Sequence, residues 1–136
     1  MSGELLEIHA YEEPDRCVLT LNGELDLAGV PAFEDAALRL CRLGARELLI
    51  DISEVGFIDS SGLRAILSVK HICKEHACEL SMTHGSEQSE VLFELTRLLE
   101  RLPFRRHRRE EPRREIELWP KAPDESDEAA GRTGES

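Results

Sequence analysis

The sequence predicts an α/β fold in which about three to four helices cover a mixed sheet of four or five β-strands. Two short segments with strand character come first, and helical and strand-like segments then alternate as far as residue 104. A strand pair followed by repeating helix and strand units implies a mixed sheet with helices packed against it. A chain of 136 residues, 40% of them hydrophobic, is long enough for one domain with a single core.

The first half of the chain predicts two strands and a helix. The strands are expected over residues 6–10 and 17–21, and Asn22-Gly23 is expected to end the second. A helix should follow, because Pro31 suits a first helical turn and Gly44 suits a helix end. Between them the apolar residues recur at helical spacing: Val30, Phe33, Ala37 and Leu40.

The second half predicts two more strands, each followed by a helix. Residues 47–52 form a short apolar run, which is typical of a strand covered on both faces. The helix after it turns three apolar residues inward: Ile66, Val69 and Cys73. Residues 79–83 predict another strand, and a third helix is expected from Gly85-Ser86 to about Arg101, where Pro103 closes it.

The charge is unevenly distributed and marks the end of the folded part. The whole chain carries a net charge of −11, whereas residues 105–121 carry +3 and residues 122–136 carry −4. Residues 122–136 contain no Val, Ile, Leu or aromatic residue, so they predict a disordered acidic tail. The Arg-rich extension, residues 105–121, is expected to be a solvated linker, although Ile116, Leu118 and Trp119 suit a last strand, a short helix or a docking patch.

Composition also excludes several classes of function. Aromatic residues make up only 4% of the chain, which argues against an aromatic surface that stacks nucleic-acid bases. The net charge is strongly negative, which argues against binding to nucleic acid backbones. No apolar run is long enough to span a membrane, and the first residues lack the order of a signal peptide, so we expect a cytoplasmic protein.

The four cysteines are expected to be reduced thiols. Their densest cluster, with two histidines, lacks the usual spacing of zinc ligands, and a helix would point His71 and Cys73 to different faces. The sequence therefore predicts no metal site in this cluster, which consists of His71, Cys73, His76 and Cys78.

The segment Phe57-Ile58-Asp59-Ser60-Ser61-Gly62-Leu63 lies between a predicted buried strand and a helix. In one interpretation Asp59 or Ser60 simply caps the helix, because their side-chain oxygens accept hydrogen bonds from unpaired first-turn amides. In the other, a hydroxyl at the start of the helix is presented to a partner. Polar residues do form one stripe along this helix: Ser60, Arg64, Ser68, His71 and Glu75.

Asp59-Ser60-Ser61-Gly62-Leu63 resembles the signature of anti-sigma factor antagonists, which are bacterial regulators built on the STAS domain. Three more segments agree with that family in order and spacing: Gly23-Glu24-Leu25-Asp26, residues 48–52 with Phe57-Ile58, and Phe93-Glu94-Leu95-Thr96. The resemblance covers about residues 5–104, and it implies a STAS-like domain over residues 1–104.

The resemblance implies a phosphorylation switch. In such antagonists the first serine of the segment, here Ser60, is phosphorylated by a partner anti-sigma factor, which is a serine kinase and supplies ATP and magnesium. The unphosphorylated antagonist binds this kinase and frees a sigma factor for transcription, and a serine phosphatase resets the switch. The antagonist itself is then not an enzyme, and it needs no cofactor and contacts neither nucleic acid nor membrane directly.

The resemblance also implies a partner-binding surface around Ser60. Asp59 would orient the loop or bond across the interface, and Ser61 would be the N-cap, a neighbouring contact or a rival acceptor. Arg64 departs from the family, because many members have a small residue there. It would clash with a standard partner, pair with an acid on a dedicated one, or clamp a phosphate on Ser60. The expected surface comprises Gly23, Asp26, Asp59, Ser61, Gly62, Arg64 and Ser68.

Three other functions remain open at this point. A hydrolase is disfavoured, because no Gly-x-Ser-x-Gly elbow is present and Asp59 adjoins the serine instead of orienting a histidine. A STAS module can also be an accessory part of a transport or stress-signalling complex. A nucleic-acid binder would use Arg105 to Arg114, and its binding would be sensitive to salt.

Overall fold

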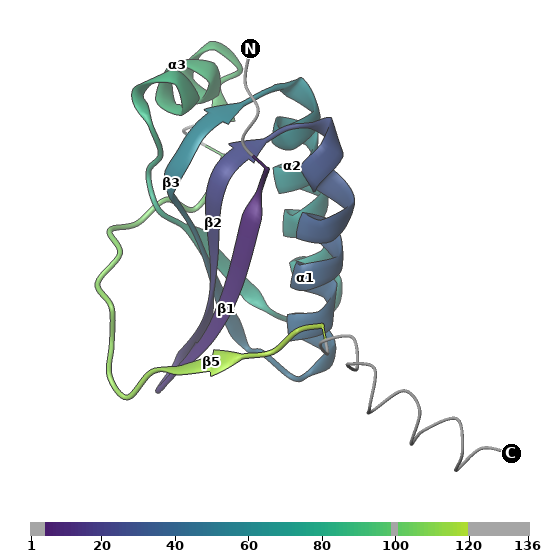
Figure 1. Cartoon of the computed structure of the whole chain (residues 1–136), viewed down its shortest axis with the longest axis vertical. Coiled ribbons are helices and arrows are strands. Elements are labelled where there is room, and N and C mark those ends of the chain that lie inside the picture. Colours follow the sequence, from purple (N-terminus) through teal and green to yellow (C-terminus); the bar gives the residue numbers. More distant parts are fainter. Residues whose placement is uncertain (1–4, 99–100, 120–136) are drawn as a thin grey trace, which may run out of the picture.

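The computed structural model describes residues 5–98 and 101–119, and these form a five-stranded mixed sheet with helices on it (Figure 1). The strand order is β4-β3-β2-β1-β5. The first two strands are antiparallel, β3 is parallel to both β2 and β4, and β5 is antiparallel to β1. The mixed α/β sheet predicted from the sequence is confirmed. The strands are β1 (Glu7–Glu13), β2 (Arg16–Leu25), β3 (Glu47–Ile58), β4 (Glu79–Met82) and β5 (Arg114–Ile116).

Three α-helices and one 3-10 helix occur in the described part of the chain. They are η1 (Leu27–Gly29), α1 (Val30–Arg42), α2 (Ser60–Glu75) and α3 (Glu87–Leu95). Helices α1 and α2 lie side by side on one face of the sheet, and α3 lies beyond the end of β3 (Figure 1). The core fills the space between these two helices and the sheet, with fully buried residues such as Phe33, Leu40, Leu48, Ile50 and Ile66. None of the described helices is long and apolar enough to cross a bilayer.

Strand β2 is longer than the sequence predicts. Asn22-Gly23 does not end it; the strand continues to Leu25, and its register with β3 shifts on either side of this dipeptide. Gly23 has a φ of 113°, and a Cβ there would lie 2.4 Å from the carbonyl oxygen of Leu5. A glycine at an irregularity within a strand accounts for the difference from the predicted strand end.

Helix α3 is shorter than the sequence predicts, because it ends at Leu95 instead of about Arg101. The Thr96 hydroxyl donates to the carbonyl of Leu92 at 2.8 Å, and Arg97 has a φ of 62°, in the left-handed region. Such a residue ends a helix. The predicted start is correct, because the hydroxyl of Ser86 accepts a hydrogen bond from the Ser89 amide.

The face of the sheet opposite α1 and α2 is crossed by the chain that follows α3 (Figure 1). His107 Nδ1 lies 3.2 Å from a carboxylate oxygen of Asp51 in β3. The Arg16 guanidinium in β2 donates to the carbonyl of Arg108 at 2.7 Å. The Arg-rich extension is therefore not a solvated linker over residues 105–113, because these contacts hold it against the sheet.

A buried ion-pair group anchors this extension. Glu13, whose side chain is fully buried, lies 2.9 Å from Nε of Arg16 and 3.5 Å from Nε of Arg113. The Arg113 guanidinium also lies 3.9 Å from the ring centre of Tyr11, which is cation–π geometry. Because β5 begins at Arg114, these contacts place the last strand against β1.

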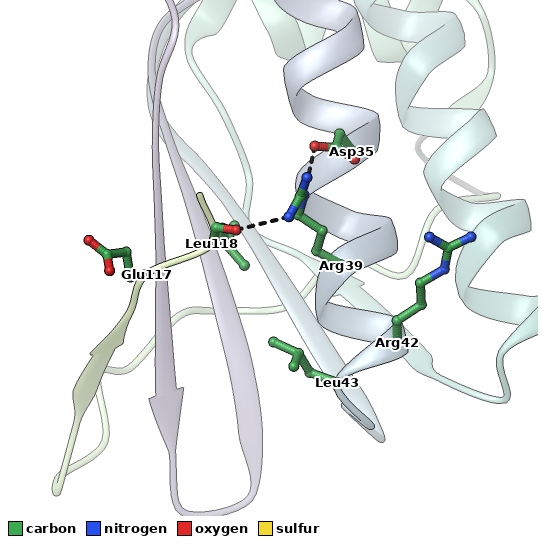
Figure 2. A pocket seen from close by; sticks show the side chains of 6 residues that line it. All are labelled: Asp35, Arg39, Arg42, Leu43, Glu117 and Leu118. Atoms are coloured by element: carbon green, nitrogen blue, oxygen red, sulfur yellow. Dashed lines mark hydrogen bonds and ion pairs between the residues drawn. The ribbon is translucent and has the colours of Figure 1, made fainter. Parts of the chain in front are cut away.

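The end of the described chain contacts α1 (Figure 2). The Arg39 guanidinium bonds both the Asp35 carboxylate at 2.8 Å and the Leu118 carbonyl at 3.2 Å. The indole of Trp119 donates to the same Asp35 carboxylate at 2.7 Å. These hydrogen bonds, that from Trp119 first and that from Arg39 second, hold the pKa of Asp35 below its ordinary value. The predicted acidic tail, residues 122–136, lies outside the described residues.

Candidate functional site at the start of helix α2

Asp59 closes the first turn of α2. Its carboxylate accepts a hydrogen bond from the Gly62 amide at 2.9 Å, and its backbone is extended, as expected of an N-cap. The Asp59 amide in turn donates to the Leu25 carbonyl at 3.2 Å, which ties the loop to the end of β2. Asp59 is therefore the cap, and Ser61, which the sequence offered for that position, is a half-buried residue of the first turn.

Ser60 is the first residue of α2 and is exposed. Among residues 5–98 and 101–119, no group forms a hydrogen bond with its hydroxyl. Because Asp59 takes the capping position, the Ser60 side chain is left available to solvent. The helix N-terminus beneath it favours negative charge, so a phosphate attached here is compatible with the local field.

Gly62 sets how closely α2 approaches β2. A Cβ at this position would lie 2.3 Å from the Leu25 carbonyl oxygen and 2.8 Å from its Cγ. Gly62 is buried, so it offers no side chain to a partner and instead allows the close contact between α2 and Leu25. Glycine allows this approach because it has no side chain.

Gln88 of α3 holds the other side of the loop, and sequence reasoning missed it. Its amide oxygen accepts from the Ile58 amide at 3.0 Å, and its amide nitrogen donates to the Ile58 carbonyl at 3.0 Å. Ile58 is the last residue of β3, directly before Asp59. A glutamine in the first turn of a helix carries no local signal of such a contact.

The predicted polar stripe is present along α2. Ser60, Arg64, His71 and Glu75 are exposed and Ser68 is half-buried, while His71 pairs with Glu75 at 3.3 Å. The surface is not wholly polar, because exposed apolar side chains occur on α2 and on neighbouring elements. They are Leu67 on α2 (40% exposed), Phe57 near the end of β3 (41%) and Leu27 in η1 (70%).

The remaining two predicted residues lie on the chain that leads into α1. Asp26 is half-buried and precedes η1, a short helix that contacts α2. Gly23 is buried at the irregularity of β2. Asp26 thus directly precedes the short helix that contacts α2, whereas Gly23 lies within β2.

The cysteines gather at the other end of the helix layer. Cys41, Cys73 and Cys78 are buried, and Cys17 is half-buried. Burial raises the pKa of Cys41 to about 11 and also raises the pKa of Cys17. The pKa of Cys78 is lowered to about 7, because its thiolate accepts a hydrogen bond from the Cys73 thiol, and the same bond raises the pKa of Cys73.

The family model described as the STAS domain matches residues 7–111, which is more than half of the chain. The chain belongs to the STAS domain family. The short strand β5 lies beyond the matched residues.

Relatives of this STAS chain are anti-sigma factor antagonists. An anti-sigma-B factor antagonist of Staphylococcus aureus is 28% identical over 78 residues, which cover 57% of this chain and 72% of the relative. The fold resembles a solved anti-sigma factor antagonist from Mycobacterium paratuberculosis, with a TM-score of 0.61 and 22% identity over 76% of this chain and 85% of that one. It also resembles the Bacillus cell fate determinant SpoIIAA in the phosphorylated form, with a TM-score of 0.56 and 18% identity over 96% and 99% of the two chains.

Proposed function

We propose that this STAS protein is an anti-sigma factor antagonist that is controlled by phosphorylation of Ser60. In this proposal the unmodified protein binds an anti-sigma factor that is also a serine kinase, and a sigma factor is released. Phosphorylation weakens the binding, and a serine phosphatase restores it. The observation that carries the proposal is the exposed Ser60 hydroxyl, which is free of hydrogen bonds within the described residues at the start of a capped helix.

The local structure favours a phosphate that leaves the fold intact. A phosphate adds about −1.5 to −2 charges and three acceptor oxygens. The N-terminus of α2 attracts negative charge, and exposed Arg64 lies one helical turn further on the same face. The Asp59 cap, the Gly62 contact and the Gln88 bonds lie beneath or beside the serine, and none of them uses its hydroxyl.

The same phosphate weakens an interface that fits a bare hydroxyl. It adds bulk, must be stripped of water and repels acidic groups on the partner. The surface proposed to contact the partner combines exposed apolar side chains with the polar stripe, and its members are Asp26, Leu27, Phe57, Asp59, Ser60, Ser61, Arg64, Leu67 and Ser68. Gly23 and Gly62 support this surface from below.

The chain acts by binding in this proposal and performs no catalysis of its own. The kinase supplies ATP and magnesium. We propose a cytoplasmic protein, because a sigma factor and its kinase act in that compartment. The names of the relatives support the general role, and a structural neighbour, SpoIIAA, is known in both unphosphorylated and phosphorylated forms. In this proposal the switch belongs to the STAS-like domain, residues 1–104, and residues 105–121 form an extension.

The test is the site of phosphorylation. Purified protein is incubated with ATP and lysate of its own source, and intact-mass and peptide mass spectrometry then locate the phosphate. We expect one phosphate on Ser60, none on the Ser60→Ala variant, and unchanged modification of Ser61→Ala. A phosphate on Ser61 alone would move the acceptor by one residue. If an established antagonist is modified under the same conditions and this chain is not, the switch is contradicted and a constitutive binding module, such as a part of a transport complex, takes its place.

A further inference from the structure

Three cysteines from two helices and the following turn converge in the core. Cys41 lies in the last turn of α1, Cys73 lies near the end of α2, and Cys78 follows the turn before β4. Their side chains are buried, and the three sulfur atoms all lie within 4.8 Å of one another. The fourth cysteine, Cys17 on β2, is not a member of this group.

The sulfur atoms are slightly further apart than the thiolates of a zinc site. A Zn–S bond is about 2.3 Å, so two thiolates on a tetrahedral zinc ion are about 3.8 Å apart. The Sγ atoms of Cys41 and Cys73 are 4.0 Å apart. Shifts of a few tenths of an ångström to about one ångström, within the reach of a side-chain rotation, would bring all three sulfurs to bonding distance.

The backbone holds the three ligands in place. The Cys78 amide donates to the Cys73 carbonyl at 2.8 Å across the turn, and Ala77 takes a φ of 55° to close it. Helix α1 packs along α2, which brings Cys41 to the same point. Metal binding would therefore need little ordering of the chain, which favours affinity.

Of the three cysteines, Cys41 borders a surface cavity. A cavity of about 460 Å³ is lined by Cys41, the loop that follows α1 and the turn that follows α2. His76 lines this cavity, and its Nδ1 lies 2.9 Å from the Ile72 carbonyl. A hydrogen bond from Nδ1 to a carbonyl leaves Nε2 as the free nitrogen, the arrangement common among zinc-binding histidines.

We propose that Cys41, Cys73 and Cys78 bind one zinc ion through three thiolates, with the fourth position facing the cavity beside His76. Three sulfur ligands select a thiophilic ion over magnesium or calcium. The site clamps the ends of α1 and α2 and the turn before β4. It lies thirteen residues along α2 from Ser60, which is about 20 Å at 1.5 Å per residue. It is therefore separate from the proposed phosphorylation switch.

The experiment measures metal uptake by the reduced, full-length protein after treatment with a chelator. Zinc is titrated first, and cobalt(II) then serves as the spectroscopic probe. We expect one equivalent of either ion per chain, strong tetrahedral d–d absorption from cobalt with a thiolate charge-transfer band, and a higher Tm with zinc. Cys17→Ser is the matched control and should keep all of these signals.

Cys41→Ala should lose the charge-transfer band and the rise in Tm while keeping the circular dichroism spectrum of the fold. A Cys78→Ala variant serves the same purpose if Cys41→Ala does not fold. Uptake that is absent from the reduced wild type, or equal in wild type and Cys41→Ala, overturns the proposal. A disulfide within the three cysteines, together with no metal uptake after reduction, also overturns it and assigns the cluster to redox chemistry.

Discussion

Ser60 is presented to solvent by its neighbours, each of which performs a structural task. Asp59 satisfies an amide of the first turn, Gly62 lets the helix sit against the Leu25 carbonyl, and Gln88 fixes the strand end before the loop. In the segment Asp59-Ser60-Ser61-Gly62, Asp59 and Gly62 thus stabilise the structure, whereas Ser60 has the proposed functional role. Substitutions next to the serine should reduce stability even where they leave the hydroxyl untouched.

Gly62→Ala tests this division. The added Cβ would lie 2.3 Å from a backbone oxygen, so α2 must move, and overpacking of this kind costs about 1–3 kcal/mol. We expect the free energy of unfolding in urea to fall by that amount. Gly56→Ala is the control, because its Cβ would meet nothing closer than 3.9 Å. Equal stability of the two variants would contradict the close packing of α2 on β2.

At the scale of elements, the C-terminal extension contacts the open face of the sheet, the sheet edge and helix α1. It crosses the face of the sheet left open by α1 and α2, adds β5 to the edge and then reaches α1 through Leu118 and Trp119. Its arginines form ion pairs with the sheet that local composition did not reveal.

Glu13→Ala should destabilise the fold strongly. It removes the carboxylate between Arg16 and Arg113, whose side chains are only 8% exposed, and breaking a buried pair typically costs about 3–5 kcal/mol. Urea unfolding is the measurement. Glu111→Ala, which removes an exposed pair with Arg109, is the control and should cost about 0–1 kcal/mol. Similar losses for both would mean that the extension does not bury Glu13.

The attachment to α1 should depend on pH through Asp35. Because its pKa is lowered in the folded protein, the stabilisation is present above the ordinary carboxyl pKa of about 3.9 and is lost as the pH falls through the lowered value. Trp119 is the single tryptophan, so its fluorescence reports this contact.

We expect the emission to be constant from neutral pH to about pH 4 and to change below it, since that is where the Asp35 carboxylate protonates. Asp35→Asn should remove this transition, and circular dichroism separates it from acid unfolding. An acid transition of the same midpoint in Asp35→Asn would show that another group controls the Trp119 environment.

At the scale of the whole molecule, periodic patterns predicted most of the sheet and helices, and one short motif predicted the candidate site. What the sequence could not predict depends on contacts between distant residues. Gln88 reaches Ile58 across 30 positions, and Cys41 meets Cys73 across 32. The early end of α3 rests on one residue, Arg97, in a left-handed conformation that no periodicity indicates.

The proposed switch and the proposed metal site lie at opposite ends of α2. Phosphorylation at the first residue should therefore act on the partner interface and leave the core, with its cysteines, unchanged. A coupling free energy of about 1–3 kcal/mol is usual for such regulation and corresponds to a change in affinity of roughly 5- to 150-fold.

The affinity of the kinase for the two forms of the protein tests the proposed switch at Ser60. The kinase is isolated by its affinity for the unmodified protein, and its Kd is measured by calorimetry for unmodified and Ser60-phosphorylated chains in the presence of ADP. We expect binding that is weaker by about 5- to 150-fold after phosphorylation, with unchanged circular dichroism of the phosphorylated chain. Equal affinity for the two forms would contradict it.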